Sequence, residues 1–396
     1  MVPFSPPLAA FDSIPRTRIV FGNGVVVRLG ELARELKATR VLLVTDPGIL
    51  KAGHVERAIE SLRKSGIEAT IFSAVRENPT TLDVARCVAA AREAQVDMLV
   101  GLGGGSSMDT AKGCNFIYTN GGEMRDYWGV GKATKPMLPL IAIPTTAGTG
   151  SECQSAALIA DDITHQKMAC LDPRAAARIA VLDPELTVSQ PARVTAFTGA
   201  DAITHAVETA VTTKRNPVSQ MYSREAFTLC VGSFERVLSH PSDLEARGRM
   251  LLGAAFAGTA IEHSMLGAAH AGANPLTAHF GIVHGAAVGI LLPHVIRFNS
   301  VAPAAKRLYA ELASALEIAC VSEGLDAAVE ALIARIETLL NIAGIPRSLV
   351  EAGLKRELIP ELATEAARQW TVNFNPRPLS PPDFEWLYSS ACDPRQ

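Results

Sequence analysis

The chain has 396 residues, which is more than a single hydrophobic core usually supports, so we expect two compact domains. Apolar residues make up 48% of the chain and charged residues 19%, which is enough apolar surface for both cores. The net charge of -3 argues against the broad positive surface that nucleic acids or anionic membranes require.

Nothing in the sequence predicts export or membrane insertion. Residues 1–10 contain three prolines and no basic segment before an apolar core, so a signal peptide is not expected. No apolar run approaches the roughly 18 residues of a membrane span. The seven cysteines include no C-x-x-C pair, which favours reduced thiols. We therefore expect a cytoplasmic protein with no nucleic-acid and no membrane partner.

Short β-branched runs alternate with a helical segment in the first half of the chain. Strands are predicted over residues 40–45, 97–102, 138–143 and 177–182, with a helix over residues 81–94. This alternation is typical of a mostly parallel sheet covered by helices. The sequence therefore predicts an α/β dinucleotide-binding domain over residues 1–192.

Strand signals fade after Pro191, and long Ala-, Leu- and Glu-rich segments replace them. Helices are predicted over residues 246–260, 303–319 and 327–343. We therefore expect residues 193–396 to form an all-helical domain that binds a metal and the substrate.

A glycine-rich turn follows the predicted strand at residues 97–102, where the sequence reads G-L-G-G-G-S-S-M-D from Gly101 to Asp109. Bare backbone N–H groups and a helix N-terminus meet there, which is how proteins bind pyrophosphate. The turn does not spell G-x-G-x-x-G, because Ser106 stands where the third glycine would fall. An ordinary turn remains the alternative interpretation.

Two further segments end predicted strands with polar groups. Asp46 could accept hydrogen bonds from ribose hydroxyls and would repel a 2′-phosphate, which favours NAD over NADP. Its alternative role is to begin an Asp-Pro turn. The segment Pro144–Glu152 carries several hydroxyl groups that could bond phosphate or ribose, and its alternative is a polar loop.

Asp201 and His205 are four residues apart, so a helix would place both on one face where they could hold one cation. Alone, such a pair more often supports a helix start and a satisfied histidine. Five of the nine histidines, however, fall between His263 and His294. We expect His270 to end one helix and His284 to begin the next, because a proline and a glycine interrupt the segment between them.

One carboxylate and three imidazoles suit Fe2+ or Zn2+, with an open position for a substrate oxygen. At a helix N-terminus the macrodipole disfavours imidazolium, which would keep His284 neutral and able to coordinate.

At this point the sequence resembles the iron-containing (group III) alcohol dehydrogenase family, within the dehydroquinate synthase-like superfold. The matching stretches occur in order over nearly the whole chain: residues 21–24, 103–109, 144–149, 199–205, 270–285, 292–295 and 375–378. The resemblance implies that the metal is held by Asp201, His205, His270 and His284. It implies that the cofactor is contacted by Asp46, Gly104, Gly105, Ser106, Asp109, Thr145, Thr146, Thr149 and Lys167.

Three positions depart from the family pattern. Val283 replaces the usual proline before the last metal histidine, which we expect to alter loop stiffness only. Ser107 replaces a common proline of the glycine-rich turn, which should leave the turn intact. Asn274 stands where many members have a histidine near the nicotinamide, so a proton-relay role cannot be transferred, although Asn274 stays a candidate catalytic residue.

The function expected from these features is a metal-dependent, NAD(P)-linked alcohol dehydrogenase that interconverts a small alcohol and its aldehyde or ketone. A metal-independent reductase of maleylacetate type is one alternative, and retention of four ligands argues against it. Another is a sugar-phosphate cyclase, which needs cationic side chains, yet residues 258–292 contain no Lys or Arg. A homodimer or higher homo-oligomer is also expected, with residues 21–24 as a candidate exchanged edge strand.

Overall fold

The computed structural model describes residues 10–164 and 166–393. The contacts within the chain define two compact units, and neither is continuous in sequence. One, here called the α/β unit, consists of Arg16–Thr198 and Arg236–Gly258. The other, the helical unit, contains Gly199–Glu235 and the chain from Thr259 onward. The division expected after residue 192 stays a prediction about folding domains.

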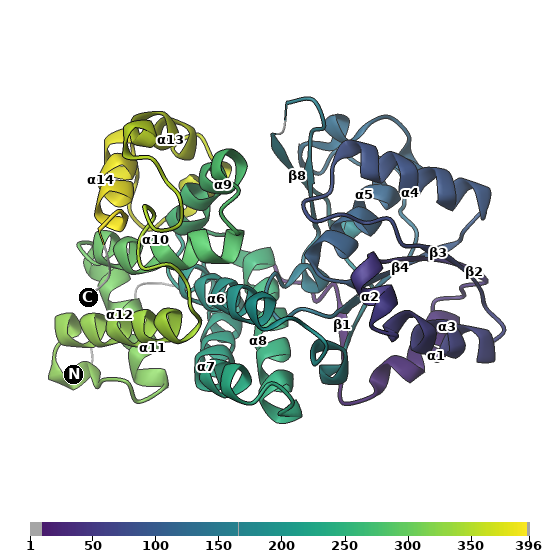
Figure 1. Cartoon of the computed structure of the whole chain (residues 1–396), viewed down its shortest axis with the longest axis horizontal. Coiled ribbons are helices and arrows are strands. Elements are labelled where there is room, and N and C mark those ends of the chain that lie inside the picture. Colours follow the sequence, from purple (N-terminus) through teal and green to yellow (C-terminus); the bar gives the residue numbers. More distant parts are fainter. Residues whose placement is uncertain (1–9, 165, 394–396) are drawn as a thin grey trace. The chain divides into compact units, whose positions relative to one another are not determined.

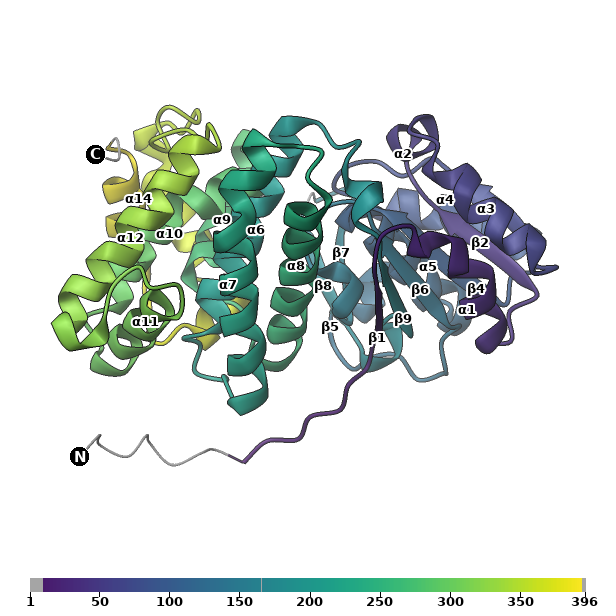
Figure 2. The same cartoon turned by 90° about the horizontal axis from the view of Figure 1, so that it is seen from below.

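The α/β unit is built on a six-stranded sheet whose strands are all parallel. In spatial order the strands are β1 (Arg18–Phe21), β9 (Ile179–Leu182), β6 (Leu140–Pro144), β4 (Met98–Gly103), β2 (Arg40–Val44) and β3 (Glu68–Phe72). Figure 2 labels all of them except β3. The four strands predicted from sequence are β2, β4, β6 and β9, so the predicted fold class is confirmed. Every residue of β4 and β6 is buried, as continuous apolar runs require.

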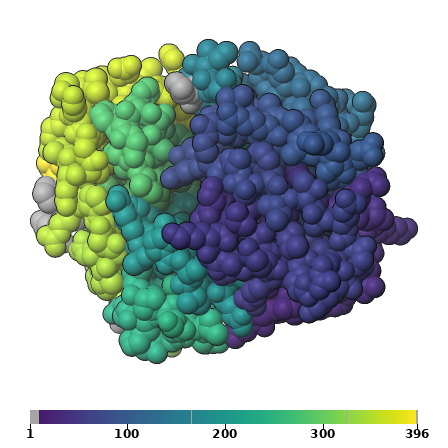
Figure 3. Space-filling model, turned by 45° about the vertical axis from the view of Figure 1, so that its right-hand side comes forward, coloured from purple at the N-terminus to yellow at the C-terminus, as the bar shows by residue number. Residues whose placement is uncertain are grey.

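Helices cover both faces of this sheet. Successive strand residues point to opposite faces, so Leu42 joins one apolar core and Leu43 the other. The first core contains residues of α4 (Thr81–Glu93) and α5 (Gly105–Asn120), and the second contains residues of α1 (Leu29–Glu35) and α3 (His54–Lys64). The short helix α2 (Pro47–Lys51) follows β2. On the face shown in Figure 3, the purple and blue residues of this unit form an unbroken surface.

A second, three-stranded sheet completes the α/β unit. It pairs β5 (Gly129–Val130) with β8 (Lys167–Leu171) in parallel, and β8 with β7 (Ala156–Ala160) in antiparallel. The sequence did not predict this sheet, because β5 has only two residues and the five-residue strands β7 and β8 have one β-branched residue between them.

The C-terminal half is helical, as predicted. The helices after β9 are α6 (Ala192–Thr209), α7 (Pro217–Ser239), α8 (Leu244–Ser264), α9 (Ala268–Phe280), α10 (His284–Asn299), α11 (Pro303–Ala315), α12 (Leu325–Ile342), α13 (Ile359–Ala366) and α14 (Pro381–Ala391) (Figure 1). Within the helical unit, α9 packs against α10 and α13. Among the described residues, no helix is both long and apolar enough to cross a membrane.

The expectation that His270 ends a helix is wrong. His270 lies in the first turn of α9, and Pro275 is accommodated inside that helix. A proline removes one backbone hydrogen bond, and the packing of α9 against its neighbours evidently outweighs that local cost. The helix ends at Gly281, whose φ of 62° is the left-handed conformation that glycine adopts without strain. His284 begins α10, as predicted.

Val283, which stands where the family usually has proline, already has a backbone suited to proline. Its φ is -56°, inside the range that the proline ring imposes. We therefore expect Val283→Pro to stabilise the protein by about 0.4–1 kcal/mol, because it reduces the freedom of the unfolded chain. Urea unfolding of the metal-free protein measures the effect, and a lower unfolding midpoint in the variant would contradict the prediction.

Candidate metal centre and cofactor site

Three helices bring the predicted metal ligands together, and all of the ligands lie in the helical unit. Asp201 lies on α6, His270 in the first turn of α9 and His284 at the first residue of α10. One ligand atom from each of these three side chains lies within 4.8 Å of the others. Nε2 of His270 is 3.4 Å and Nε2 of His284 is 4.0 Å from Oδ1 of Asp201.

His205, the fourth predicted ligand, adjoins this group from the same face of α6 as Asp201. Its Nε2 lies 3.5 Å from Oδ1 of Asp201. Its ring stacks on that of His270, with centroids 4.6 Å apart and planes inclined by 15°. All four side chains therefore lie in one cluster, although they come from segments up to 83 residues apart (284 − 201).

Two atoms of this cluster lack the partners that buried polar atoms normally have. Oδ1 of Asp201 and Nε2 of His270 are buried and make no hydrogen bond. Leaving such an atom unsatisfied costs about 1–3 kcal/mol, and more for a charged group. A divalent cation coordinated by both atoms would remove that cost, so the residues fit Fe2+ or Zn2+. The His284 side chain is 30% exposed against 6% for Asp201, so the cluster opens on the side of His284.

The charges in the cluster are strongly coupled. Burial alone would raise the pKa of the Asp201 carboxyl, but the surrounding imidazoles hold that pKa below its usual value. Burial opposes the charged form of His270, yet the carboxylates of Glu208 and Asp201 raise its pKa to about 9. At neutral pH the metal-free cluster therefore contains a protonated His270 beside ionised Asp201.

Metal uptake should consequently depend on pH. A cation must displace the proton of His270, so its affinity should rise with pH and level off for this group near pH 9. From this group alone we expect about a tenfold gain per pH unit between pH 6 and pH 8. Competition with a chelator measures Zn2+ affinity across that range, and an affinity that does not change with pH would contradict the expectation.

Glu208 is a buried acid of this cluster that the sequence analysis did not single out. It is 2% exposed, and its Oε2 lies 2.6 Å from Nδ1 of His270. A sequence signal existed: Asp201, His205 and Glu208 are spaced i, i+4 and i+7, which is one face of a helix.

Asn274 lies one turn beyond His270 on α9 and is outside the group of metal-binding atoms. Its Nδ2 donates a hydrogen bond of 3.0 Å to Oε1 of Gln369. This contact gives Asn274 a side-chain partner, and its candidate catalytic role stays a prediction.

In the α/β unit, the glycine-rich turn joins β4 to α5 and leaves no room for side chains. A Cβ atom at Gly103 would lie 2.4 Å from Oγ of Ser107, and one at Gly105 would lie 2.9 Å from Cγ2 of Thr149. Gly104 is the N-cap of α5, and a Cβ there would lie 3.3 Å from Thr146. The turn therefore presents bare backbone at a helix N-terminus, packed against the loop of residues 144–149.

The same region contains buried hydroxyl groups without partners. Oγ of Ser107 and Oγ1 of both Thr145 and Thr146 are buried and make no hydrogen bond. Threonines 145 and 146 are among the residues predicted to bind the cofactor. Unsatisfied hydroxyls beside a bare helix N-terminus fit the phosphates and riboses of a nicotinamide dinucleotide.

Asp46 has the helix-capping role that the sequence left open, and its ribose-binding role stays a prediction. Its Oδ1 accepts hydrogen bonds from the backbone N–H of Gly48 (2.8 Å) and of Ile49 (3.1 Å), which caps α2. Its Oδ2 lies 3.3 Å from the position that a Cβ on Gly103 would take. The second oxygen is thus directed to the glycine-rich turn, where a ribose hydroxyl could bind.

Asp109 has contacts within the α/β unit that the sequence did not suggest. Its Oδ1 accepts a hydrogen bond of 2.7 Å from Oγ of Ser151 and lies 3.9 Å from Nζ of the fully buried Lys112. Burial raises the pKa of Asp109, against the opposing effect of Lys112.

Two other predicted cofactor residues are Lys167 and Ser106. Lys167 is exposed at the start of β8, and the carbonyl of Ser106 accepts a hydrogen bond from the hydroxyl of Thr110. Direct cofactor contacts of these residues stay predictions.

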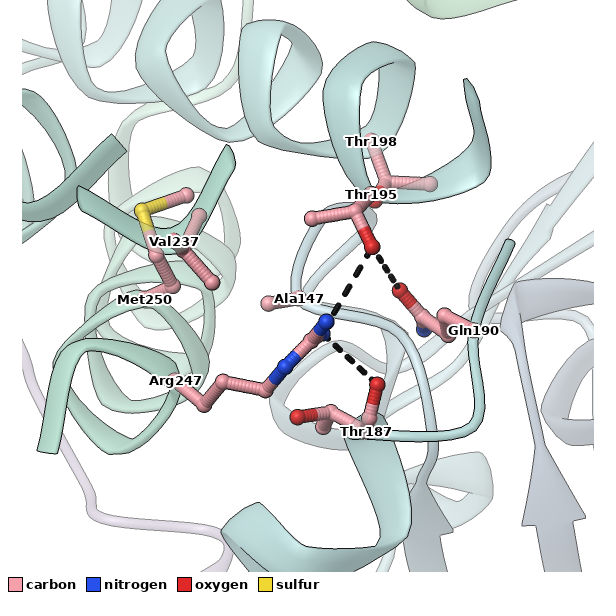
Figure 4. Close-up of a pocket in the computed structure, with 8 residues that line it drawn as sticks. All are labelled: Ala147, Thr187, Gln190, Thr195, Thr198, Val237, Arg247 and Met250. Atoms are coloured by element: carbon pink, nitrogen blue, oxygen red, sulfur yellow. Dashed lines mark hydrogen bonds between the residues drawn. The ribbon is translucent and has the colours of Figure 1, made fainter. Parts of the chain in front are cut away.

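A small cavity lies beside the loop of residues 144–149, here called the threonine loop (Figure 4). Its volume is about 10 Å³, which holds at most one water-sized occupant. The guanidinium of Arg247 donates to the carbonyl of Thr187 (2.6 Å), and Thr195 donates to Gln190. Gln190 in turn donates to the carbonyl of Thr145. The last of these bonds holds the backbone of the loop that carries the predicted cofactor residues Thr145, Thr146 and Thr149.

Comparison with known proteins accounts for both halves of the chain. Residues 15–184 match the model of iron-containing alcohol dehydrogenases, and residues 195–392 match the model of the C-terminal part of the Fe-containing alcohol dehydrogenase family. The chain therefore belongs to the iron-containing alcohol dehydrogenase family. It is an oxidoreductase of the alcohol dehydrogenase type, as the sequence predicted.

Individual relatives agree in length and fold. The NAD-dependent methanol dehydrogenase of Bacillus methanolicus is 33% identical, over 94% of this chain and 97% of the relative. The 1,3-propanediol dehydrogenase of Klebsiella pneumoniae is 35% identical, over 93% and 95%. A crystal structure of a 1,3-propanediol oxidoreductase has a TM-score of 0.93 at 32% identity, covering 97% of this chain and all of the other. The sulfoacetaldehyde reductase of Bifidobacterium kashiwanohense, solved in complex with NAD+, has a TM-score of 0.87 at 27% identity, covering 97% and 99%.

Proposed function

We propose that the protein is a metal-dependent, NAD-linked dehydrogenase that interconverts a small alcohol and its aldehyde or ketone by hydride transfer. In this proposal Asp201, His205, His270 and His284 hold Fe2+, with Zn2+ as the alternative ion. The observation that supports it most strongly is the pair of buried, unsatisfied ligand atoms on Asp201 and His270.

The chemistry follows from the donor set. A bound divalent cation would act as a Lewis acid that makes a substrate hydroxyl easier to deprotonate and a carbonyl easier to reduce. Asp201 supplies the negative charge of the centre, and the buried rings of His205 and His270 exclude water from one side of it. The partly exposed His284 lies at the side from which a substrate oxygen would approach.

The proposed cofactor is NAD, held by the glycine-rich turn and the threonine loop of the α/β unit. Asp46 supports this choice, because Oδ2 would accept from ribose hydroxyls and repel a 2′-phosphate. The bound NAD+ of the sulfoacetaldehyde reductase structure is consistent with it.

The proposed substrates are small uncharged alcohols. Residues 258–292, which include two of the metal ligands, contain no Lys or Arg that could bind an anionic substrate. The connection between α8 and α9 adds the apolar side chains of Met265 and Leu266. The named substrates of two relatives, methanol and 1,3-propanediol, belong to the same class.

We also propose a cytoplasmic homo-oligomer, most simply a homodimer. Within the α/β unit β1 is an edge strand, and the Phe21 side chain at its end is 46% exposed. Edge strands pair readily with a second chain. Sedimentation of wild type and of a Gly22 and Gly24 double variant tests the idea, and unchanged sedimentation would contradict it.

The function is tested by a reconstitution screen. The protein is stripped of metal, reloaded anaerobically with Fe2+ or Zn2+, and mixed with a panel of primary alcohols and either NAD or NADP. We expect reduced cofactor to accumulate only with metal-loaded protein. Equal turnover by the stripped protein would favour a metal-independent reductase, and no net cofactor reduction with any alcohol or carbonyl would favour a cyclase-like lyase.

A further inference from the structure

Glu208 makes an unusually complete set of contacts for a buried carboxylate. Besides the 2.6 Å contact with Nδ1 of His270, its oxygens accept backbone hydrogen bonds from Ala269 (2.6 Å) and Gly267 (3.2 Å). A buried carboxylate without such partners would be costly. The contacts with Ala269 and Gly267 fix the start of α9, and the contact with Nδ1 fixes the side chain of His270 in that first turn.

We propose that Glu208 is a positioning residue that presents Nε2 of His270 to the metal; this inference rests on the metal site proposed above. Both carboxyl oxygens of Glu208 already act as acceptors toward backbone N–H groups, so the geometry points to Nδ1 of His270 as the donor in the third contact. When the ring is neutral, its lone pair then stands on Nε2. That is the atom which is buried without a hydrogen bond and lies 3.4 Å from Asp201.

The backbone contacts make this orientation rigid. Glu208 caps the positive end of α9, so the helix turn and the ring of His270 are held by the same carboxylate. A Cβ atom on Gly267 would lie 3.2 Å from Oε1 of Glu208 and 2.9 Å from Oδ1 of Asn375, so the approach is close. Asn375 accepts from the N–H of Ala268 at 3.3 Å and thus caps the same helix end without contacting the ring through any described bond.

Glu208 contacts the ring of His270 and Asn375 does not, so variants of the two residues can be compared. In Glu208→Gln one carboxylate oxygen becomes an NH2 group, which faces either the N–H of Ala269 or Nδ1 of His270. In the first arrangement two N–H donors face each other, which is unfavourable. In the second, the NH2 group donates to Nδ1 and so favours the tautomer of His270 with its proton on Nε2, the atom that would bind the metal. We expect the affinity for Zn2+, measured against a chelator, to fall by about 10- to 100-fold. The visible spectrum of the Co2+-loaded variant should also change.

Two control variants separate positioning from stability. Asn375→Ala removes the other cap of α9 and should lower the melting temperature while leaving the affinity for Zn2+ within about twofold, because the ring of His270 stays in place. Glu365→Gln removes an exposed acid–imidazole pair of the same length, Glu365 with His279 at 2.6 Å, and should change neither property. Unchanged affinity in Glu208→Gln, or equal losses in Glu208→Gln and Asn375→Ala, would overturn the inference.

A measurement on wild type covers the case in which Glu208→Gln does not fold. In the Zn2+-loaded protein labelled with 15N-histidine, we expect a strongly downfield, slowly exchanging proton on Nδ1 of His270, assigned by its loss in His270→Ala. Its absence from the wild-type spectrum would overturn the inference. If His270→Ala keeps full metal content, the metal site itself is wrong, whereas loss of metal there with normal binding in Glu208→Gln rejects only the role of Glu208.

Discussion

Asp201→Asn is expected to abolish metal retention and to reduce kcat/KM by about three orders of magnitude or more. The variant keeps the shape of the side chain but removes the only negative charge among the four proposed ligands. A catalytic cation contributes several kcal/mol of transition-state stabilisation, and each 1.4 kcal/mol corresponds to about a tenfold change in rate. Metal analysis after gel filtration and steady-state kinetics measure the two effects.

The same variant carries its own control, because the proposed cofactor residues lie in the other unit of the chain. Calorimetric titration with NAD should give a dissociation constant close to that of the wild type. Undiminished metal content together with normal turnover in Asp201→Asn would show that the cluster is not the catalytic centre.

Asp46→Asn is expected to shift cofactor preference toward NADP by about 10- to 100-fold in the ratio of kcat/KM values. Removing a unit charge about 4 Å from a phosphate is worth on the order of 1–4 kcal/mol between the limits for water and for a protein surface. Asparagine still caps a helix, so α2 should keep its first turn. Kinetics with both cofactors at saturating alcohol measure the ratio.

Asp243→Asn is the matched control for this experiment. Asp243 accepts from the N–H of Ala246 at 3.0 Å at the start of α8, so it is another helix-capping aspartate of the α/β unit. It is not among the residues predicted to contact the cofactor, and its variant should keep the wild-type preference. A shift of equal size in both variants would assign the effect to net charge rather than to Asp46.

The sequence predicted that the four proposed metal ligands would lie close together, because the spacing of these residues along the chain indicates it. Asp201 and His205 are one helical turn apart, and His270 and His284 belong to a dense group of histidines. The strands β2, β4, β6 and β9 were predicted for a similar reason, since buried parallel strands are continuous apolar runs. Local patterns were sufficient for both.

The sequence analysis was wrong, or missed a residue, where tertiary contacts determine the structure. Pro275 normally interrupts a helix, yet α9 continues through it while packed against α10 and α13. Glu208 is seven residues after Asp201, but only the fold shows that it reaches His270, which is 62 residues further along the chain. The resemblance implied that Asp109 contacts the cofactor, which stays a prediction; its hydrogen bond from Ser151, in a loop 42 residues further along the chain, could not be read from local pattern.

The unequal exposure of the metal-binding side chains has a kinetic consequence. Asp201 and His270 are almost wholly enclosed, whereas His284 begins its helix partly in contact with solvent. An incoming chelator or competing ion would meet His284 before the enclosed pair. Dissociation of the His284 imidazole would then set how fast a bound ion is exchanged. The lifetime of the metal-loaded enzyme would therefore depend on the partly exposed ligand rather than on the two buried ones.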